Sequence, residues 1–457
     1  MLIESLEPNH DTAFLIGKLL LKSELNLSER EIEQWLKEKK LEKSPAILFR
    51  GRQGRPVCVR CHNQDFFQFG QHPCAKCGSP SCYYCRHCLS LGKVQACQGL
   101  YRWIGDQPKL TKVVKSLAWE GELSVGQIRA SEQIVSWLEQ KKTGLVWAVC
   151  GAGKTEIIFR GLEKAFAKGW RVLLATPRTD VVKELEPRFQ QAFPSIRMAA
   201  LYGGSEHKDR CHMFILATTH QVLRYENAFD CIIVDEVDAF PFSFDKSLQF
   251  AVERARKQAA PIIYLSATPN QSLLRQSELQ MVKIPKRFHG YPLPVPRLKW
   301  VGDWTKKIKK RKLPSPLIQW LTEHLTQPIL LFVPTIAVVE QLSDALSLKG
   351  FSHGKVYADA RDRHQTVNAF REGSISLLVT TTILERGVTI SNVAVAVLGA
   401  ENPVFDEAAL VQISGRVGRD RKFPEGEICF FHFGRTLAMN RAIRQVKMMN
   451  REGTLLS

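Results

Sequence analysis

The sequence predicts an α/β protein with two parallel-sheet lobes, preceded by a small cysteine-rich module. Two series of short apolar runs, each followed by a polar or helical segment, indicate βαβ units. A stretch rich in proline and charge separates the two series, and eight of the twelve cysteines fall between Cys58 and Cys97. The 457 residues are enough for two or three domains of this kind.

The chain divides into five predicted segments. They are an N-terminal helical region (1–57), a zinc-binding module (58–100), a first lobe (110–285), a basic and proline-rich linker (286–316) and a second lobe (317–457). The strands expected in the first lobe are 144–149, 171–176, 214–218, 231–235 and 261–268. Those expected in the second lobe are 329–335, 353–358, 375–382, 393–400 and 427–433.

Charge and hydropathy narrow the class of protein. A formal net charge of +19 and a pI near 9.5 favour a polyanionic partner, such as a nucleic acid. No apolar run is long enough to predict a membrane-spanning helix, and the first residues lack the pattern of a secretory signal. Because export is not expected, the clustered cysteines favour metal binding over disulfide formation.

The segment AVCGAGKT follows an apolar strand and opens a helix, as a phosphate-binding loop does. Lys154 is expected to reach the β- and γ-phosphates of ATP, and Thr155 to bind Mg²⁺. In the later segment DEVD, Asp235 is expected to hold Mg²⁺ and Glu236 to polarise the attacking water. The predicted nucleotide contacts are Gly151, Ala152, Gly153, Lys154, Thr155, Glu156 and Gln127.

Gln127 has two interpretations. Its amide can pair with both a donor and an acceptor on adenine, and Trp119 could stack on the base. Ser124 and Gln127 also form the pattern of a helix-capping box, which explains the residue without a ligand.

The segment QISGRVGR places Arg416 and Arg419 on one face of a helix. Two guanidinium groups suit the negative charge of a phosphoryl transition state, and Gln412 is expected to sense the nucleotide. The glycines beside the arginines, Gly415 and Gly418, favour a close approach to a ligand.

The cysteines predict zinc. Two CxxC pairs can supply four thiolates to one tetrahedral, structural ion: Cys58, Cys61, Cys85 and Cys88. Cys74, Cys77 and Cys82 lie between these pairs and indicate a second metal site, with Cys97, His72 or His87 as its fourth ligand. A zinc ribbon that pairs the first CxxC with Cys74 and Cys77 remains an alternative.

The basic run at 306–312 suggests a flexible strap in the hinge between the lobes. Such a strap could contact DNA that bridges the cleft. A solvated linker is the alternative.

In order, AVCGAGKT, TPR, DEVD, SAT, TTILERG and QISGRVGR resemble the motifs of superfamily 2 helicases, which have two RecA-like lobes. Together with CVRC, YYCRHC and LGKV, they make the chain similar to the ComFA family of late-competence ATPases. This resemblance implies that Arg416 and Arg419 act as arginine fingers, that SAT links hydrolysis to lobe movement, and that Arg386 and Gly387 lie near the nucleotide. It also implies one zinc site, formed by Cys58, Cys61, Cys85 and Cys88.

By the same resemblance, the expected activity is hydrolysis of ATP with Mg²⁺, stimulated by single-stranded DNA and coupled to DNA uptake. The expected partners are single-stranded DNA, a ComFC-like phosphoribosyltransferase-related protein, a ComEC-like membrane DNA channel and further copies of the chain. The expected location is cytoplasmic, at the inner face of the cell membrane and reached through partners.

Two alternatives remain. A PriA-like replication-restart helicase shares related lobes and zinc knuckles, but it is longer and its cysteines lie inside the second lobe. A non-catalytic zinc-containing DNA-binding scaffold would be expected to lack Lys154, Glu236 or Arg419, all of which are present.

Overall fold

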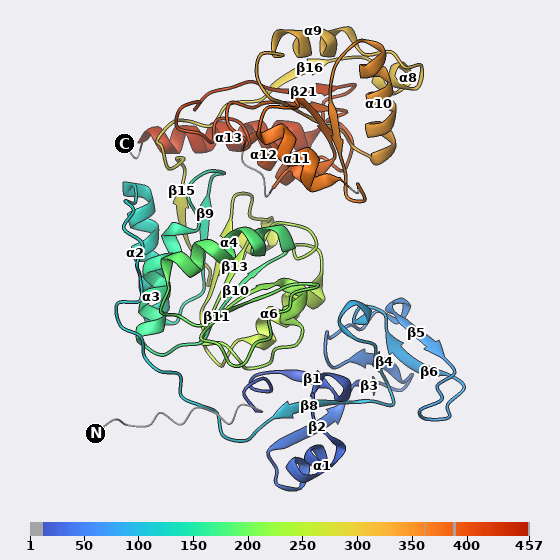
Figure 1. Cartoon of the computed structure of the whole chain (residues 1–457), viewed down its shortest axis with the longest axis vertical. Helices are drawn as coiled ribbons and strands as arrows, with labels where there is room; N and C mark the ends of the chain where they lie inside the picture. The colour runs from blue at the N-terminus through green and yellow to red at the C-terminus, as the bar shows by residue number, and fades with distance from the viewer. Residues whose placement is uncertain (1–11, 361, 387–389, 456–457) are drawn as a thin grey trace.

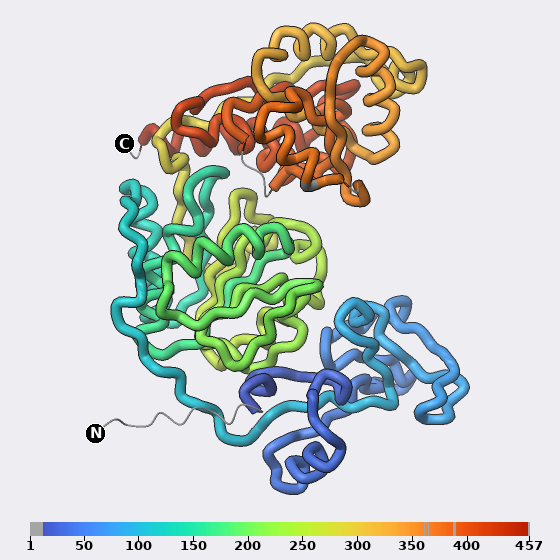
Figure 2. The backbone as a smooth tube through the Cα atoms, in the orientation of Figure 1, coloured from blue at the N-terminus to red at the C-terminus, as the bar shows by residue number. Residues whose placement is uncertain are grey.

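The computed structural model describes residues 12–360, 362–386 and 390–455. Two α/β lobes are stacked along the long axis, and the N-terminal part lies beside the first lobe, away from the second (Figure 1). The same path is visible in the backbone tube (Figure 2). This arrangement confirms the predicted fold class.

The first lobe is built on a seven-stranded sheet in which every neighbouring pair is parallel. Its central strands are fully buried runs of apolar residues, as expected where helices cover both faces. Across the sheet the strands are β11 (Met198–Leu201), β12 (Phe214–Thr218), β10 (Val172–Thr176), β13 (Cys231–Asp235), β14 (Ile262–Ser266), β9 (Gly144–Ala148) and β15 (Gln280–Ile284). The helices are α2 (Val125–Gln140), η4 (Glu156–Ile158), α3 (Phe159–Ala167), α4 (Thr179–Ala192), α5 (Thr219–Val222), α6 (Lys246–Ala255) and α7 (Gln271–Leu274).

The second lobe has a six-stranded parallel sheet. Its strands, in order across the sheet, are β16 (Arg297–Trp300), β21 (Ile428–His432), β20 (Ala394–Leu398), β17 (Ile329–Phe332), β19 (Leu377–Thr380) and β18 (Gly354–Val356). Its helices are α8 (Trp304–Lys309), α9 (Ser315–Glu323), α10 (Ile336–Leu348), α11 (Arg363–Arg371), η5 (Thr382–Leu384), α12 (Glu407–Ser414) and α13 (Leu437–Leu455). Among the described residues, no helix is both long and apolar enough to cross a membrane.

Helix α13 belongs to both lobes. Ala442 is buried in the core of the second lobe, whereas Val446 and Met449 are buried in the core of the first. Between them, the Gln445 side-chain amide donates a 2.7 Å hydrogen bond to the carbonyl oxygen of Ala267 in the SAT segment. The last helix therefore connects the two cores directly.

The N-terminal region is largely not helical, contrary to the expectation for residues 1–57. Within residues 12–57 the single α-helix is α1 (Glu29–Lys37), which begins at a capping box formed by Ser28 and Glu31. The remainder includes η1 (Lys22–Glu24) and the strands β1 (Leu19–Leu21), β2 (Leu41–Pro45), β3 (Ile47–Arg50) and β4 (Arg55–Cys58). Strand β8 (Gly99–Trp103) lies between β1 and β2, so the chain leaves this sheet for the cysteine module and then returns to it.

The cysteine module contains the β3–β4 hairpin and a three-stranded antiparallel sheet, with two short helical turns. The elements after the hairpin are η2 (Phe66–Gln68), β5 (Phe69–His72), β6 (Cys82–Cys85), η3 (Leu89–Leu91) and β7 (Val94–Gln95).

The second lobe starts earlier than the sequence suggested. Strand β16 and helix α8 fall inside the expected linker 286–316, and β16 pairs with β21 at the edge of the second sheet. Trp304 and Ile308 bury one side of α8 against the lobe. Residues 306–309 of the basic run thus belong to α8 and residues 310–312 follow it, at the end of the second lobe away from the first, so the hypothesis of a flexible strap in the hinge is wrong (Figure 1).

Candidate functional site

The segment after β9 forms a tight loop that leads into η4 and α3. Gly151 and Gly153 have φ angles of +80° and +70°, a left-handed conformation that glycine adopts at no steric cost. A Cβ atom at Gly153 would lie 2.4 Å from the Gln127 amide nitrogen. Glycine is therefore required at position 153, and the loop has the left-handed turns that a phosphate-binding loop needs.

The carboxylates of DEVD lie opposite this loop, at the end of β13. Lys154 Nζ is 3.9 Å from Asp235 Oδ1. Burial raises the pKa of Asp235 to about 6, although the charge of Lys154 opposes the rise. Glu236 has a left-handed φ of +54°, and its N–H donates to Asp235 Oδ1 at 2.8 Å. One edge of the sheet thus holds the ammonium group of Lys154 and the carboxylates of Asp235 and Glu236.

Arg386 of the second lobe reaches this edge. Its guanidinium contacts both Glu236, with Nη1 3.3 Å from Oε2, and Asp238. The Asp238 carboxylate also accepts 2.6 Å hydrogen bonds from Ser266 and Thr268 of the SAT segment. Burial alone would raise the pKa of Asp238, but the Arg386 charge and these bonds lower it to about 2. A buried ionic network therefore joins the DEVD and SAT segments to the second lobe.

Helix α12 ends at Ser414, so Arg416 and Arg419 lie after it and not on one face of a helix as expected, and the two arginines differ in their surroundings. Arg416 is buried, and its Nε donates to the carbonyl oxygen of Glu385 at 2.9 Å. Burial lowers the pKa of Arg416 well below its usual value. Arg419 is half-buried, and its Nε donates to the Gly415 carbonyl at 2.8 Å.

A cleft of about 770 Å³ lies between the lobes. Residues of both lobes line it, and nearly all the residues that the sequence singled out for ATP are among them. These are Gln127, Gly151, Gly153, Lys154, Thr155, Glu156, Asp235, Glu236, Gln412, Arg416 and Arg419. Ala152 is buried in the loop and does not line the cleft.

Gln127 lines this cleft, and both ends of its side-chain amide are hydrogen-bonded within the chain. The capping box is present, because Gln127 Oε1 accepts from the Ser124 N–H at 2.8 Å. The amide nitrogen donates to the Ala152 carbonyl at 3.0 Å, so the side chain also braces the phosphate-binding loop. Trp119 lines the same cleft and packs edge-on against Phe159.

The segment that follows β15 also reaches the cleft, although no sequence motif marks it. The Phe288 N–H donates to the Gly151 carbonyl at 3.0 Å, and the Phe288 ring lines the cleft. The buried Arg287 donates to backbone carbonyls that lie between Arg416 and Arg419 in the chain. Both residues lie in a proline-rich stretch that was expected to be a linker. Nothing in its sequence pattern indicates that it contacts the cleft.

Two more segments of the first lobe, TPR and YGG, make contacts outside the ATP cleft. Arg178 of TPR donates to the carbonyl oxygen of Ile383 at 3.0 Å, a further contact between the lobes. The YGG segment (202–204) lines a separate groove of about 730 Å³, whose opposite side is formed by the N-terminal region. Gly387 lies outside the described residues.

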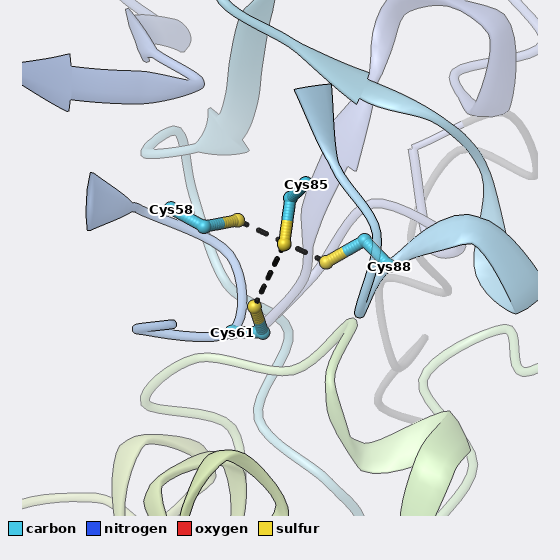
Figure 3. A group of neighbouring side chains, drawn as sticks. All are labelled: Cys58, Cys61, Cys85 and Cys88. Carbon is cyan, nitrogen blue, oxygen red and sulfur yellow. Dashed lines mark hydrogen bonds between the residues drawn. The ribbon is translucent and has the colours of Figure 1, made fainter. Parts of the chain in front are cut away.

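The first cysteine cluster joins two loops of the module. Its members, Cys58, Cys61, Cys85 and Cys88, are fully buried, and their sulfur atoms lie within 4.8 Å of one another. Figure 3 shows the four side chains turned toward a common centre. Asn63 Nδ2 lies 3.8 Å from Cys85 Sγ and adds a donor to the sulfur. Four convergent, buried sulfurs are the donor set of a structural zinc site.

A second cluster of four sulfurs lies in the same module. Its members are Cys74, Cys77, Cys82 and Cys97. The two histidines considered as ligands are engaged elsewhere: His72 bonds Gln95, and His87 pairs with Asp245 of the first lobe. The alternative zinc ribbon is wrong, because the first CxxC groups with Cys85 and Cys88 rather than with Cys74 and Cys77.

Three family models match successive parts of the chain. The competence protein ComFA N-terminal domain matches residues 7–102, the type III restriction enzyme res subunit 120–271, and the helicase conserved C-terminal domain 312–421. Among solved structures, Dbp5 of S. cerevisiae bound to RNA and ADP BeF3 has a TM-score of 0.51 at 14% identity. That match covers 72% of this chain and 91% of the other, and it shows the shared two-lobe fold.

Two curated relatives match almost from end to end. The competence protein ComFA of Bacillus subtilis (strain 168) is 43% identical over 443 residues, which cover 95% of this chain and 94% of the relative. The competence protein ComFA of Streptococcus pneumoniae (strain ATCC BAA-255 / R6) is 37% identical, with 96% and 98% covered. With its helicase lobes and its cysteine module in place, the chain belongs to the competence protein ComFA family.

Proposed function

We propose that this protein is an ATP-driven motor on single-stranded DNA that draws transforming DNA across the cytoplasmic membrane. The observation that carries the proposal is the network around Arg386, which ties the second lobe to Glu236 and Asp238 beside the phosphate-binding loop. A change at the nucleotide would alter this network and hence the relation between the lobes. Membership of the ComFA family supports the role in competence over a PriA-like restart function.

The cleft supplies the groups that ATP hydrolysis requires. Lys154 would neutralise the β- and γ-phosphates, and Glu236 would orient the attacking water. Thr155 and Asp235 offer the oxygen ligands that Mg²⁺ prefers, and the ion would offset phosphate charge. Arg419, on the opposite lobe, would stabilise charge on the transferred phosphoryl group.

The first cysteine cluster fits zinc as a structural ion. Four thiolates fill a tetrahedral coordination sphere, so the metal has no position left for a substrate or water. Its role would be to fold the module and to hold it against the first lobe. There His62 stacks on Phe250, with ring centroids 4.5 Å apart.

The remaining partners follow from the role in uptake. A net charge of +19 supports contact with a polyanion, and the relatives are named competence proteins. A ComEC-like channel, a ComFC-like protein and further copies of the chain are the proposed partners, at the inner face of the membrane.

The ATPase rate measured with single-stranded DNA, duplex DNA and RNA tests the proposal. We expect the strongest stimulation by single-stranded DNA, and no turnover in the Lys154→Ala variant, which loses the fixed cation in an otherwise intact loop. Equal stimulation by RNA would contradict DNA specificity. Absence of turnover in the wild-type protein would favour the scaffold alternative.

A further inference from the structure

We propose that Cys74, Cys77, Cys82 and Cys97 bind a second zinc ion, separate from the site formed by the first cysteine cluster. Their four sulfur atoms lie within 4.8 Å of one another, and those of Cys74 and Cys97 are 3.9 Å apart. Cys77 is exposed and Cys97 half-exposed, so burial of apolar side chains does not explain why the four converge. A tetrahedral ion at their centre does.

The backbone of this second cluster repeats that of the first. After Cys58-x-x-Cys61, the N–H of His62 donates to the Cys58 carbonyl at 2.8 Å, and His62 has a φ of +58°. After Cys74-x-x-Cys77, the N–H of Gly78 donates to the Cys74 carbonyl at 2.9 Å, and its φ is +67°. Both turns thus present two sulfurs of a CxxC pair to one point.

Strand β6 connects the two clusters. It begins at Cys82 and ends at Cys85, three residues apart, so the two side chains leave opposite faces of the strand. Cys82 joins the second cluster and Cys85 the first. One strand of four residues thereby contributes a ligand to each of two sites.

The loop between β5 and β6 has little else to order it. Of residues 73–81, Cys74 alone is buried. A segment with so few buried side chains cannot offset its conformational entropy by packing and needs a cross-link. A metal held also by Cys97 would fasten this loop to the chain just before β8.

Zinc suits the donor set better than a disulfide does. A disulfide joins two sulfurs and gives no reason for two more to approach, whereas each sulfur here is close to three others. Four thiolates in tetrahedral arrangement select Zn²⁺ among the common divalent ions.

The unequal burial of the two clusters gives each site its own behaviour. The first cluster is fully buried, but Cys77 of the second is exposed. We therefore expect a chelator to remove metal in two phases, with the second cluster emptied first.

The metal content of the purified full-length protein tests the proposal directly. We expect about two zinc ions per chain in the wild type and about one in Cys77→Ser or Cys85→Ser. The matched control Cys429→Ala, at a buried cysteine of the second lobe, should keep both. A wild-type content of about one zinc that Cys77→Ser leaves unchanged would overturn the proposal.

A second measurement needs no variant. The wild-type chain, denatured with a chelator but without reductant, should show all twelve of its cysteines as reactive thiols. Two fewer thiols would indicate a disulfide and would also overturn the proposal. Neither readout involves ATP or DNA, so the outcome is independent of the proposed motor activity.

Discussion

At the scale of single residues, the two arginines after α12 are expected to differ in how their loss affects ATP turnover and stability. Arg419 is half-buried at the cleft and Arg416 is buried against Glu385. Arg419→Ala should lower ATP turnover by about three to five orders of magnitude, as loss of an arginine finger does, while nucleotide binding and Tm change little. Arg416→Ala should lower Tm as well, since it removes a buried side chain together with its hydrogen bond to the Glu385 carbonyl.

Turnover, nucleotide affinity and thermal unfolding, measured for both variants, separate the two roles. The exposed Arg435, replaced by alanine, serves as a control for the loss of a positive charge. Near-normal turnover in Arg419→Ala would remove this residue from the chemical step.

Residues that act through a short, contiguous pattern could be predicted from the sequence. Asp235 is the last residue of one buried strand and Lys154 follows another after a short loop, so the strand ends determine where these side chains lie. Arg287 and Phe288 could not be predicted in this way. These residues donate hydrogen bonds to backbone carbonyls of segments that are distant in the chain. Such contacts produce no pattern in the local sequence.

At the scale of elements, helix α13 acts as a strut between the lobes. Met449 is buried in the first lobe, although its helix begins in the second. Met449→Ala should destabilise the protein by about 2–5 kcal/mol, the cost of a cavity in a packed core. It should also separate the unfolding of the two lobes into two transitions.

Differential scanning calorimetry checks this expectation. Leu455→Ala, at an exposed leucine near the end of the same helix, is the matched control and should leave a single transition. A single, unshifted transition in Met449→Ala would show that α13 does not couple the lobes.

The strands of both parallel sheets were largely predictable, because a buried parallel strand is a continuous apolar run. The N-terminal strands were not. Strand β1 pairs with β8, some eighty residues later, and a three-residue run such as LLL does not specify so distant a partner. Helix α8 was mistaken for part of a linker because its lysines outnumber its buried apolar residues, Trp304 and Ile308.

At the scale of the whole molecule, a buried ionic cluster fastens the N-terminal region to the first lobe. Asp209 accepts from Arg171 at 2.5 Å and from Tyr225 at 2.7 Å, and lies 3.3 Å from Lys18 of the N-terminal region. Burial alone would raise the pKa of Asp209, but the charges of Arg171 and Lys18 hold it well below its usual value. Asp209→Asn should therefore cost about 3–5 kcal/mol near neutral pH, because it leaves buried cations without their counter-charge.

The pH dependence follows from the lowered pKa. The ionised Asp209 contributes its full stability above the unfolded pKa of about 4, and this contribution is lost as the pH falls toward the lower folded value. The difference in unfolding free energy between wild type and Asp209→Asn should thus shrink below about pH 4. Asp106→Asn, at an exposed position, should show no such difference. If the difference in unfolding free energy between wild type and Asp209→Asn stayed constant down to the pH of acid unfolding, the ionic role of Asp209 would be contradicted.

Because the chain returns to the N-terminal sheet through β8, the cysteine module could be deleted without breaking that sheet. Pro45 and Gly99 are directly opposed in the β2–β8 ladder, and the next residues outward, Ala46 and Gln98, are joined by a backbone hydrogen bond of 3.2 Å. The excursion that holds both cysteine clusters therefore begins and ends at one point of the sheet. A turn of about two residues could close that point in place of residues 46–98. Any ATP turnover or DNA binding that the shortened chain retained could then be assigned to the two lobes. An activity that it lost would depend on the cysteine module.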